Sequence, residues 1–202
     1  LQAVRRQLVE SRKRLTTELG ESEKHDSKQV YQIKKNASSP TLKALAKDLE
    51  RVEKDLEKTI EDDPKLARIM EILCSIPGMG KVTSIGLIIV TEAFTKFVSA
   101  KKLACYCGVV PFDNRSGKCL KGKSKVSKKS NRQMKALLTM CARAVSRTKG
   151  ELAMYYQRKL EQGKEKMVAL NALQNKLIHR AFALVRDNRI YQKNIKINLQ
   201  IP

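Results

Sequence analysis

The chain has 202 residues, of which 42% are apolar and 4% aromatic, and its formal net charge is +22. This apolar fraction can fill a core in one or two domains, and no signal peptide or apolar stretch of about 18 residues is visible, so we expect no membrane partner. The charge is segregated, because residues 76–202 carry 26 Lys and Arg against six acids, which predicts a polyanionic partner bound through phosphate contacts rather than aromatic stacking.

Residues 1–63 predict a long antiparallel helical hairpin of the coiled-coil type. Apolar residues recur at three- and four-residue spacings in two runs, namely Leu1, Val4, Leu8 and Leu15, and then Leu42, Leu45, Leu49, Val52 and Leu56. Residues 36–40 are expected to break the helix between these runs, because Pro40 disfavours the α conformation in the residue before it. Such a hairpin either folds on itself or supports a homo-oligomer. The chain begins in helical register without Met, so we expect a preceding segment in the natural protein.

A second domain is expected from residue 64. Asp62, Asp63 and Pro64 form a helix-start signal for a helix that runs to about residue 74. Residues 76–81 then read Ile-Pro-Gly-Met-Gly-Lys, the form of a helix-hairpin-helix turn. In such a turn Gly78 and Gly80 would let a helix N-terminus approach a phosphate, with Lys81 beside it. The alternative is a tight turn between two packed helices. The continuous apolar run after Lys81 predicts a helix in the core.

The rest of the chain reads as helices interrupted by one cationic segment. Helices are expected over residues 99–107, 131–149, 151–161 and 165–187, and residues 109–129 should form an extended loop or a small β-hairpin. The predicted fold is therefore all-α. Its parts are a coiled-coil hairpin (1–63), a compact helical domain (64–190) and an extended tail (191–202).

Cations dominate residues 96–149, with 15 Lys and Arg and a single acid, Asp113. Such a density repels itself unless a polyanion is bound, so nucleic acid is the expected partner, although a solvated surface is the simpler alternative. The predicted nucleic-acid-binding residues, in addition to Gly78, Gly80 and Lys81, are Lys121, Lys123, Lys125, Lys128, Lys129, Asn131 and Lys135.

The five cysteines, Cys74, Cys105, Cys107, Cys119 and Cys141, have no CxxC spacing, and only His25 and His179 can join them as ligands. We interpret them as reduced, mostly buried thiols of a cytoplasmic protein, and we expect no metal site. His179 is expected to be a packed or surface imidazole rather than a catalyst.

Several short motifs occur in a specific order. They are Ile76-Pro-Gly-Met-Gly, Phe97-x-Ser99-Ala-x-x-Leu103, Gly108-Val-Val-Pro111, Ser116-Gly117 and Ser127-Lys-Lys-Ser-Asn131-Arg132. Together they resemble the C-terminal part of the insertion-sequence 110/116/902 transposase family, to which Piv-type DNA invertases are similar. The resemblance covers about residues 66–187, with the helical hairpin in the place of the family's coiled coil. Ser130 departs from the pattern, since family members commonly have Gly before the Asn.

The resemblance implies a composite active site. In the family, a serine at the position of Ser116 acts with four metal-binding carboxylates of an N-terminal RuvC-like domain, which this sequence does not contain. Mg²⁺ is therefore expected in that upstream domain, and no cofactor in this fragment. The resemblance also implies a structured guide RNA that pairs with target and donor DNA while the protein contacts the nucleic-acid backbone.

The chemistry of Ser116 needs help from its surroundings, because a hydroxyl is a weak nucleophile until its proton leaves or its alkoxide is stabilised. No His lies within the cationic segment, so we hypothesise electrostatic stabilisation by Arg115, Lys118 and Arg132. Ser124, Ser127 and Ser130 are rivals on chemistry alone, and the order of motifs selects Ser116. Without the resemblance, a loop Ser before Gly is an ordinary turn residue.

Two functions follow from these observations. The first is the DNA-binding, serine-bearing half of a transposase or site-specific recombinase, inactive without the upstream domain and located in the cytoplasm at the nucleoid. The second is a nucleic-acid-binding helical module without catalysis. Both predict salt-sensitive binding, and only the first predicts a covalent adduct with DNA.

Overall fold

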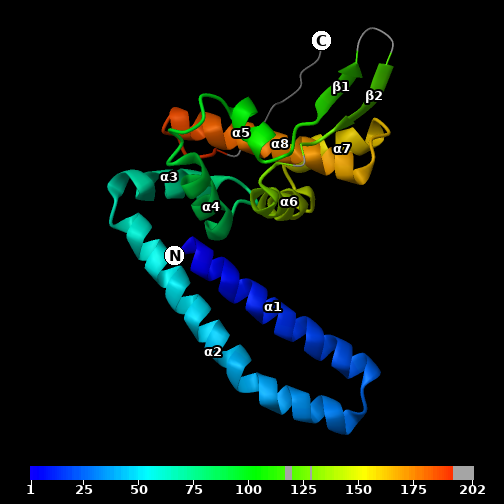
Figure 1. The fold of residues 1–202 in the computed structure, drawn as a ribbon. Helices are drawn as coiled ribbons and strands as arrows, with labels where there is room; N and C mark the ends of the chain where they lie inside the picture. Colours follow the sequence, from blue (N-terminus) through cyan, green and yellow to red (C-terminus); the bar gives the residue numbers. More distant parts are fainter. Residues whose placement is uncertain (117–119, 128, 193–202) are drawn as a thin grey trace, which may run out of the picture. The chain divides into compact units, whose positions relative to one another are not determined.

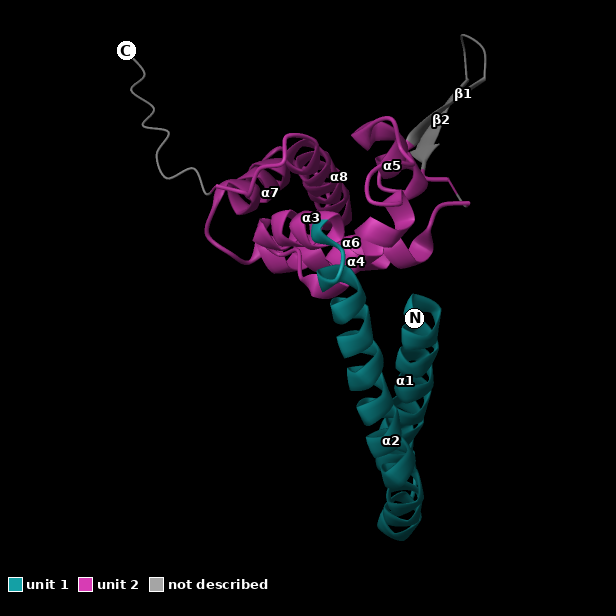
Figure 2. Ribbon diagram, turned by 90° about the vertical axis from the view of Figure 1, so that its left-hand side faces the viewer, with its two compact units in different colours: residues 1–64 teal, residues 65–202 magenta. Residues whose placement is uncertain are grey.

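The structure is a computed structural model that describes residues 1–116, 120–127 and 129–192. Eight helices and two short strands lie within these ranges, so the all-α fold class is confirmed. The chain separates into two compact units, residues 1–64 and residues 65–202 (Figure 2). Each unit is described by itself below.

The first unit is a helical hairpin. Helix α1 (Gln2–His25) and helix α2 (Lys28–Glu61) pack side by side and run in opposite directions (Figure 1). The side chains of Val52, Leu56 and Ile60 on α2 are buried. Arg5 on α1 forms an ion pair with Glu53 on α2, with 2.7 Å between Nη2 and Oε1, which links the two helices.

The predicted helix break at residues 36–40 is wrong. Helix α2 continues through Pro40, and the hairpin turns instead at Asp26 and Ser27. The hydroxyl of Ser27 accepts a hydrogen bond from the backbone N–H of Val30 and so caps α2. The carboxylate of Asp26 accepts one from Ser22 and another from Lys34, at 2.7 Å from its Nζ.

Helix α2 tolerates Pro40 because the helix is exposed there. A proline inside a helix leaves the carbonyl four residues earlier without its backbone donor. That carbonyl belongs to Asn36, which is exposed, so water can hydrogen-bond to it. Figure 1 shows α2 bent part-way along its length, the usual consequence of an internal proline.

The second unit is a cluster of six helices. They are α3 (Pro64–Ser75), α4 (Lys81–Thr91), α5 (Ala100–Tyr106), α6 (Arg132–Ser146), α7 (Glu151–Glu161) and α8 (Lys166–Arg186). Helix α8 contacts α5, α6 and α7, and its Leu173, Leu177 and Ile178 are fully buried. Helix α4 is buried along most of its length, which confirms the predicted core helix after Lys81.

Two strands lie between α5 and α6. Strand β1 (Phe112–Ser116) pairs antiparallel with β2 (Leu120–Lys125), and Ser116 stands opposite Leu120. The register is irregular between Phe112 and Asn114. The strands fall within residues 109–129, where a loop or small hairpin was expected. The side chains of residues 112–125, and most of the predicted tail at 191–202, lie outside the described part of the chain.

Among the cysteines within the described ranges, Cys107 and Cys141 are buried, Cys105 is half-buried and Cys74 is exposed, so the expectation of mostly buried thiols holds for two of these four. Burial raises the pKa of the Cys107 thiol to about 12, which keeps it protonated and unreactive. Cys119 lies outside the described residues. Within the described residues, no cluster of His, Cys, Asp or Glu can hold a metal ion, and no helix is long and apolar enough to cross a membrane.

Candidate nucleic-acid interface

Helix α6 is strongly two-sided. Its buried side chains recur at three- and four-residue spacing and face the core of the second unit, namely Met134, Leu138, Cys141, Ala142 and Val145. The Cys141 thiol reaches the hydroxyl of Thr83 on α4 at 3.2 Å. The apolar stripe therefore fixes which face of α6 turns away from the core.

The opposite face of α6 is cationic. Arg132, Lys135, Arg143 and Arg147 are spaced so that they lie along one side of the helix, with Arg147 at its C-cap. Lys135 is half-buried and the three arginines are exposed. We call these four residues the α6 basic face. It extends over about 22 Å, because about 15 residue steps of about 1.5 Å each separate Arg132 from Arg147.

No acid offsets this charge on α6. None of the four cations forms an ion pair within the described part of the chain, and no Asp or Glu occurs between Arg132 and Lys149. Some exposed cations elsewhere do have acidic partners, as Lys54 has in Glu50 at 2.9 Å. A row of unpaired cations on a rigid helix is suited to the phosphates of a nucleic acid.

The N-terminus of α6 is held by a network around Asn131. Its Oδ1 accepts a hydrogen bond from the backbone N–H of Met134 at 2.9 Å and so caps the helix. Its own backbone N–H donates to the carbonyl of Tyr106, also at 2.9 Å, which ties α6 to the end of α5. Asn131 is thus engaged in positioning α6. Its role in nucleic-acid binding stays a prediction, as does that of the exposed Lys129.

Ser130 occupies a tight position beside this cap. Gly108, at φ +68°, lies against Ser130, and a Cβ at residue 108 would collide with the Ser130 side chain. Only a glycine fits this close approach. The departure at Ser130 is therefore accommodated by Gly108 and does not disturb the start of α6.

The predicted helix-hairpin-helix turn lies between α3 and α4. Gly78 has φ +79°, and a Cβ there would collide with Val145 and come within 2.9 Å of the Cys141 carbonyl oxygen. The conformation of Gly78 is thus explained by packing against α6. Gly80 is the N-cap of α4, with open space where its side chain would be, and Lys81 is exposed at the first position of that helix. Phosphate binding by this turn stays a prediction.

The catalytic prediction lies partly outside the described residues. The backbone of Ser116 ends β1 and that of Arg115 pairs with Lys121, and the side chains of these residues lie outside the described part of the chain. The same holds for Lys123 and Lys125, while Lys118 and Lys128 are outside the described ranges altogether. Arg132 is the one predicted stabilising residue whose side chain is described, and it lies on the α6 basic face.

Arg143 and Arg147 were not among the residues predicted from the motifs. The signal for them was present in the sequence, since positions 132, 135, 139, 143 and 147 share one helical face and none of them is apolar or acidic. The last of the motifs ends at Arg132, whereas the helical spacing of these non-apolar positions continues along α6 for about four more turns.

Residues 70–157 match the family model described as Transposase IS116/IS110/IS902 family. This region of the chain is similar to the transposase domain of that family. It includes the 76–80 turn, both strands and the whole α6 basic face.

Full-length relatives support the same assignment. The chain is 27% identical over 162 residues to the pilin gene-inverting protein of Moraxella lacunata, covering 80% of this chain and 50% of that protein. It is 27% identical over 161 residues to the insertion element IS110 uncharacterized 43.6 kDa protein of Streptomyces coelicolor, covering 80% of this chain and 38% of that protein. The chain thus spans half or less of the length of these relatives.

Proposed function

We propose that this chain is the DNA-binding, serine-bearing part of a transposase or site-specific recombinase. The observation that carries the proposal is the α6 basic face, an unpaired cationic row on a rigid helix inside a transposase domain. The name of the Moraxella relatives, which describes inversion of a pilin gene, supports chemistry on DNA in the longer proteins.

The proposed reaction is attack of the Ser116 hydroxyl on a DNA phosphodiester. The Oγ–P bond forms as a P–O bond to the adjoining nucleotide breaks, and the released oxygen takes a proton to become a strand-end hydroxyl. The serine proton passes to a base that we place outside this chain. The phosphoserine link keeps the energy of the broken ester, so a second strand-end hydroxyl can reverse the step and join new DNA. Arg115, Lys118 and Arg132 would offset negative charge on the phosphorus oxygens in the transition state.

Mg²⁺ belongs to this proposal only through another part of the protein. A divalent ion there would polarise the phosphoryl oxygens and favour loss of the serine proton. The residues that the structure describes do not fit such an ion, because none of their His, Cys, Asp and Glu side chains gather into a ligand set. We therefore assign the metal to an upstream RuvC-like domain and expect this chain alone to be inactive.

The test is a covalent-trapping experiment with a longer protein that includes the upstream region. A DNA substrate nicked beside the crossover should leave a protein–DNA adduct with Ser116 present and none with Ser116→Ala. Ser124→Ala and Ser127→Ala are matched controls from the same cationic segment and should retain the adduct. An adduct that persists in Ser116→Ala refutes the assignment. Equal DNA binding with no adduct in any variant favours a non-catalytic binding module.

Two further partners belong to this proposal. A structured guide RNA is consistent with the α6 basic face, because phosphate contacts do not distinguish RNA from DNA, and RNA recovered with the purified protein would support it. A homo-oligomer through the first unit is supported by exposed apolar side chains there, among them Val4, Val30 and Ile33. Sedimentation at several concentrations tests it, and a monomer at all of them contradicts it.

A further inference from the structure

A cleft in the second unit is lined by three arginines from distant parts of the sequence. Arg68 lies on α3, Arg180 on α8 and Arg189 on the segment after α8, and the cleft has a volume of about 580 Å³. Glu151, at the start of α7, is the one acid among the residues lining it. Two of the three arginines lie beyond residue 157, so the transposase-family match does not cover the site.

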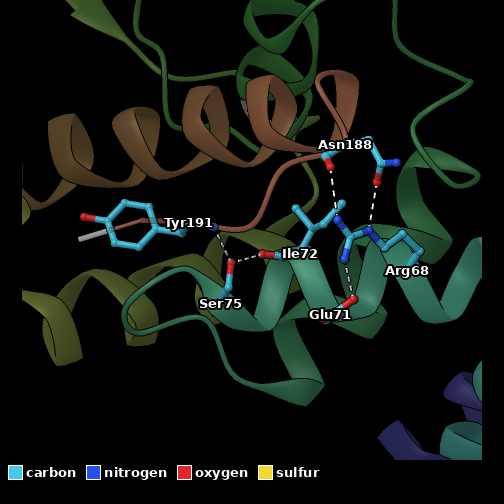
Figure 3. Close-up of polar contacts among 6 residues, drawn as sticks. All are labelled: Arg68, Glu71, Ile72, Ser75, Asn188 and Tyr191. Carbon is cyan, nitrogen blue, oxygen red and sulfur yellow. Dashed lines mark hydrogen bonds and ion pairs between the residues drawn. The ribbon is translucent and has the colours of Figure 1, made fainter. Parts of the chain in front are cut away.

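The segment after α8 is held against α3 by polar contacts. Arg68 donates from Nε to Oδ1 of Asn188 at 2.9 Å and from Nη2 to the Asn188 carbonyl at 3.1 Å (Figure 3). Its Nη1 meets Glu71 at 2.6 Å, and the backbone N–H of Tyr191 donates to the hydroxyl of Ser75 at 2.8 Å. Arg68 is therefore fixed in place on the wall of the cleft.

Arg180 and Arg189 are also held by acids. Arg180 pairs with Glu151 at 2.7 Å and stacks over the ring of Tyr191 at 5.0 Å. Arg189 pairs with Asp187, also at 2.7 Å. A guanidinium has five N–H donors, and the contacts described here leave donors on each arginine for a further acceptor. Planar, pre-positioned guanidinium groups are well matched to phosphate oxygens.

The cleft shares lining residues with a smaller hollow beside the C-terminal end of α6. A neighbouring hollow shares Glu151 and Tyr191 with the cleft and is also lined by Thr148 and Lys149, which directly follow Arg147. Lys149, two residues after Arg147, thus lies near Glu151 and Tyr191 of the cleft.

We propose that this arginine cleft binds a phosphate group of the nucleic acid that lies on the α6 basic face. The inference rests on the proposed nucleic-acid function and adds a second phosphate site to it. Arg189 is the most accessible of the three, because 71% of its side chain is exposed against 17% for Arg180. It therefore offers the best substitution for a test that leaves the fold intact.

The test measures oligonucleotide affinity against salt concentration for Arg189→Gln and a matched control, Arg186→Gln. Both arginines pair with Asp187 and are similarly exposed, at 71% and 73%, but Arg186 does not line the cleft. Arg189→Gln should raise Kd about threefold to tenfold and lower the salt slope by about 0.7 on single strands. Arg186→Gln should have the same salt slope as the parent. Arg189→Lys should have a salt slope between those of the parent and Arg189→Gln.

Glu151→Gln supplies a test of opposite sign. It removes the acid that competes for Arg180 and Lys176, so affinity should increase roughly twofold to fivefold, the strength of an exposed ion pair. A merely structural role for Glu151 predicts no gain. Oligonucleotides with and without a 5′-phosphate separate the two sources of the bound group, since an effect confined to the phosphorylated strand assigns the cleft to a terminal phosphate.

Equal salt slopes for Arg189→Gln and Arg186→Gln, or no gain in Glu151→Gln, overturn the inference. If variants of the α6 basic face still lose affinity in the same assay, the proposed function survives that result. If the parent chain shows no salt-dependent binding and the α6 variants change nothing, both proposals fail together.

Discussion

The α6 basic face predicts a specific loss when Arg143 and Arg147 are both changed to Gln. Each phosphate contact contributes about 0.9 to the slope of log affinity against log salt on duplex DNA. Between 50 and 200 mM salt, one contact therefore accounts for about a 3.5-fold change in affinity. The double variant should lower the slope by about 1.8. Between 50 and 200 mM salt, the fold-loss of affinity should therefore be about 12 times larger for the parent than for the double variant.

The assay is fluorescence anisotropy of a labelled duplex at four or more salt concentrations, with Arg186→Gln as a control for the loss of positive charge. Both substituted positions are exposed and Gln is a good helix former, so stability should change by less than about 0.5 kcal/mol. A thermal melt checks this. Equal slopes for the double variant and the parent would show that α6 does not contact phosphates, and the central observation of the proposed function would be lost.

Three further predictions concern the fold. Gly78→Ala should destabilise the second unit by about 1–3 kcal/mol, because residue 78 has a φ of +79° and a Cβ there would collide with Val145. Gly80→Ala should cost less than about 1 kcal/mol. Similar losses of unfolding free energy for the two variants in urea would contradict the packing role of Gly78. Pro40→Ala should stabilise the hairpin by up to about 3 kcal/mol, measured by its thermal melt, because α2 passes through residue 40; no gain would indicate a helix break there. Partial burial works to raise the pKa of Glu151, but hydrogen bonds from Lys176 and Arg180 outweigh it and hold the pKa below its ordinary value of 4.5. The resulting stabilisation is present above about pH 4.5 and is lost as the pH falls through the lowered pKa. The urea midpoints of the parent and of Glu151→Gln should therefore converge toward pH 3. A difference between the midpoints that does not change with pH would exclude the ion pairs of Glu151 as its cause.

The helices of the second unit were predictable because their signals are local. Ser99 caps α5 and Asn131 caps α6, each by accepting a hydrogen bond from a backbone N–H three residues on. The apolar run after Lys81 is too continuous for an exposed helix, and α4 is buried accordingly. Caps and periodicity act within a few residues, so the sequence alone reveals them.

The hairpin turn was misplaced because two local signals compete. Pro40 disfavours a helix, but its cost is limited where the helix is exposed, and Ser27 caps a helix that begins well before it. An ion pair joins Asp26 to Lys34, on opposite sides of the turn residue Ser27. The cap at Ser27 was readable from the sequence, whereas this ion pair was not.

The arginine cleft was not predictable, because its parts are brought together only by folding. Arg68 and Asn188 are 120 residues apart, and neither belongs to a motif. The α6 basic face was predictable in part. The spacing of its cations is visible in the local sequence, but which side of the helix faces outward depends on the burial of Met134 and Leu138. Local periodicity thus identified cations that can contact a nucleic acid, and tertiary packing determined which of them share a surface.

The proposed function assigns DNA binding and strand transfer to different elements of the second unit. Ser116 ends a strand of a two-stranded sheet, whereas the α6 basic face is anchored through Val145 and Cys141 to α4 and the Gly78 turn. In the proposed function, the α6 basic face holds the nucleic-acid backbone, and Ser116, on a separate element, reacts with the scissile phosphate. Binding should therefore survive changes in the hairpin that abolish strand transfer, and a substitution at Ser116 that weakened affinity as much as the Arg143 and Arg147 changes would contradict this separation.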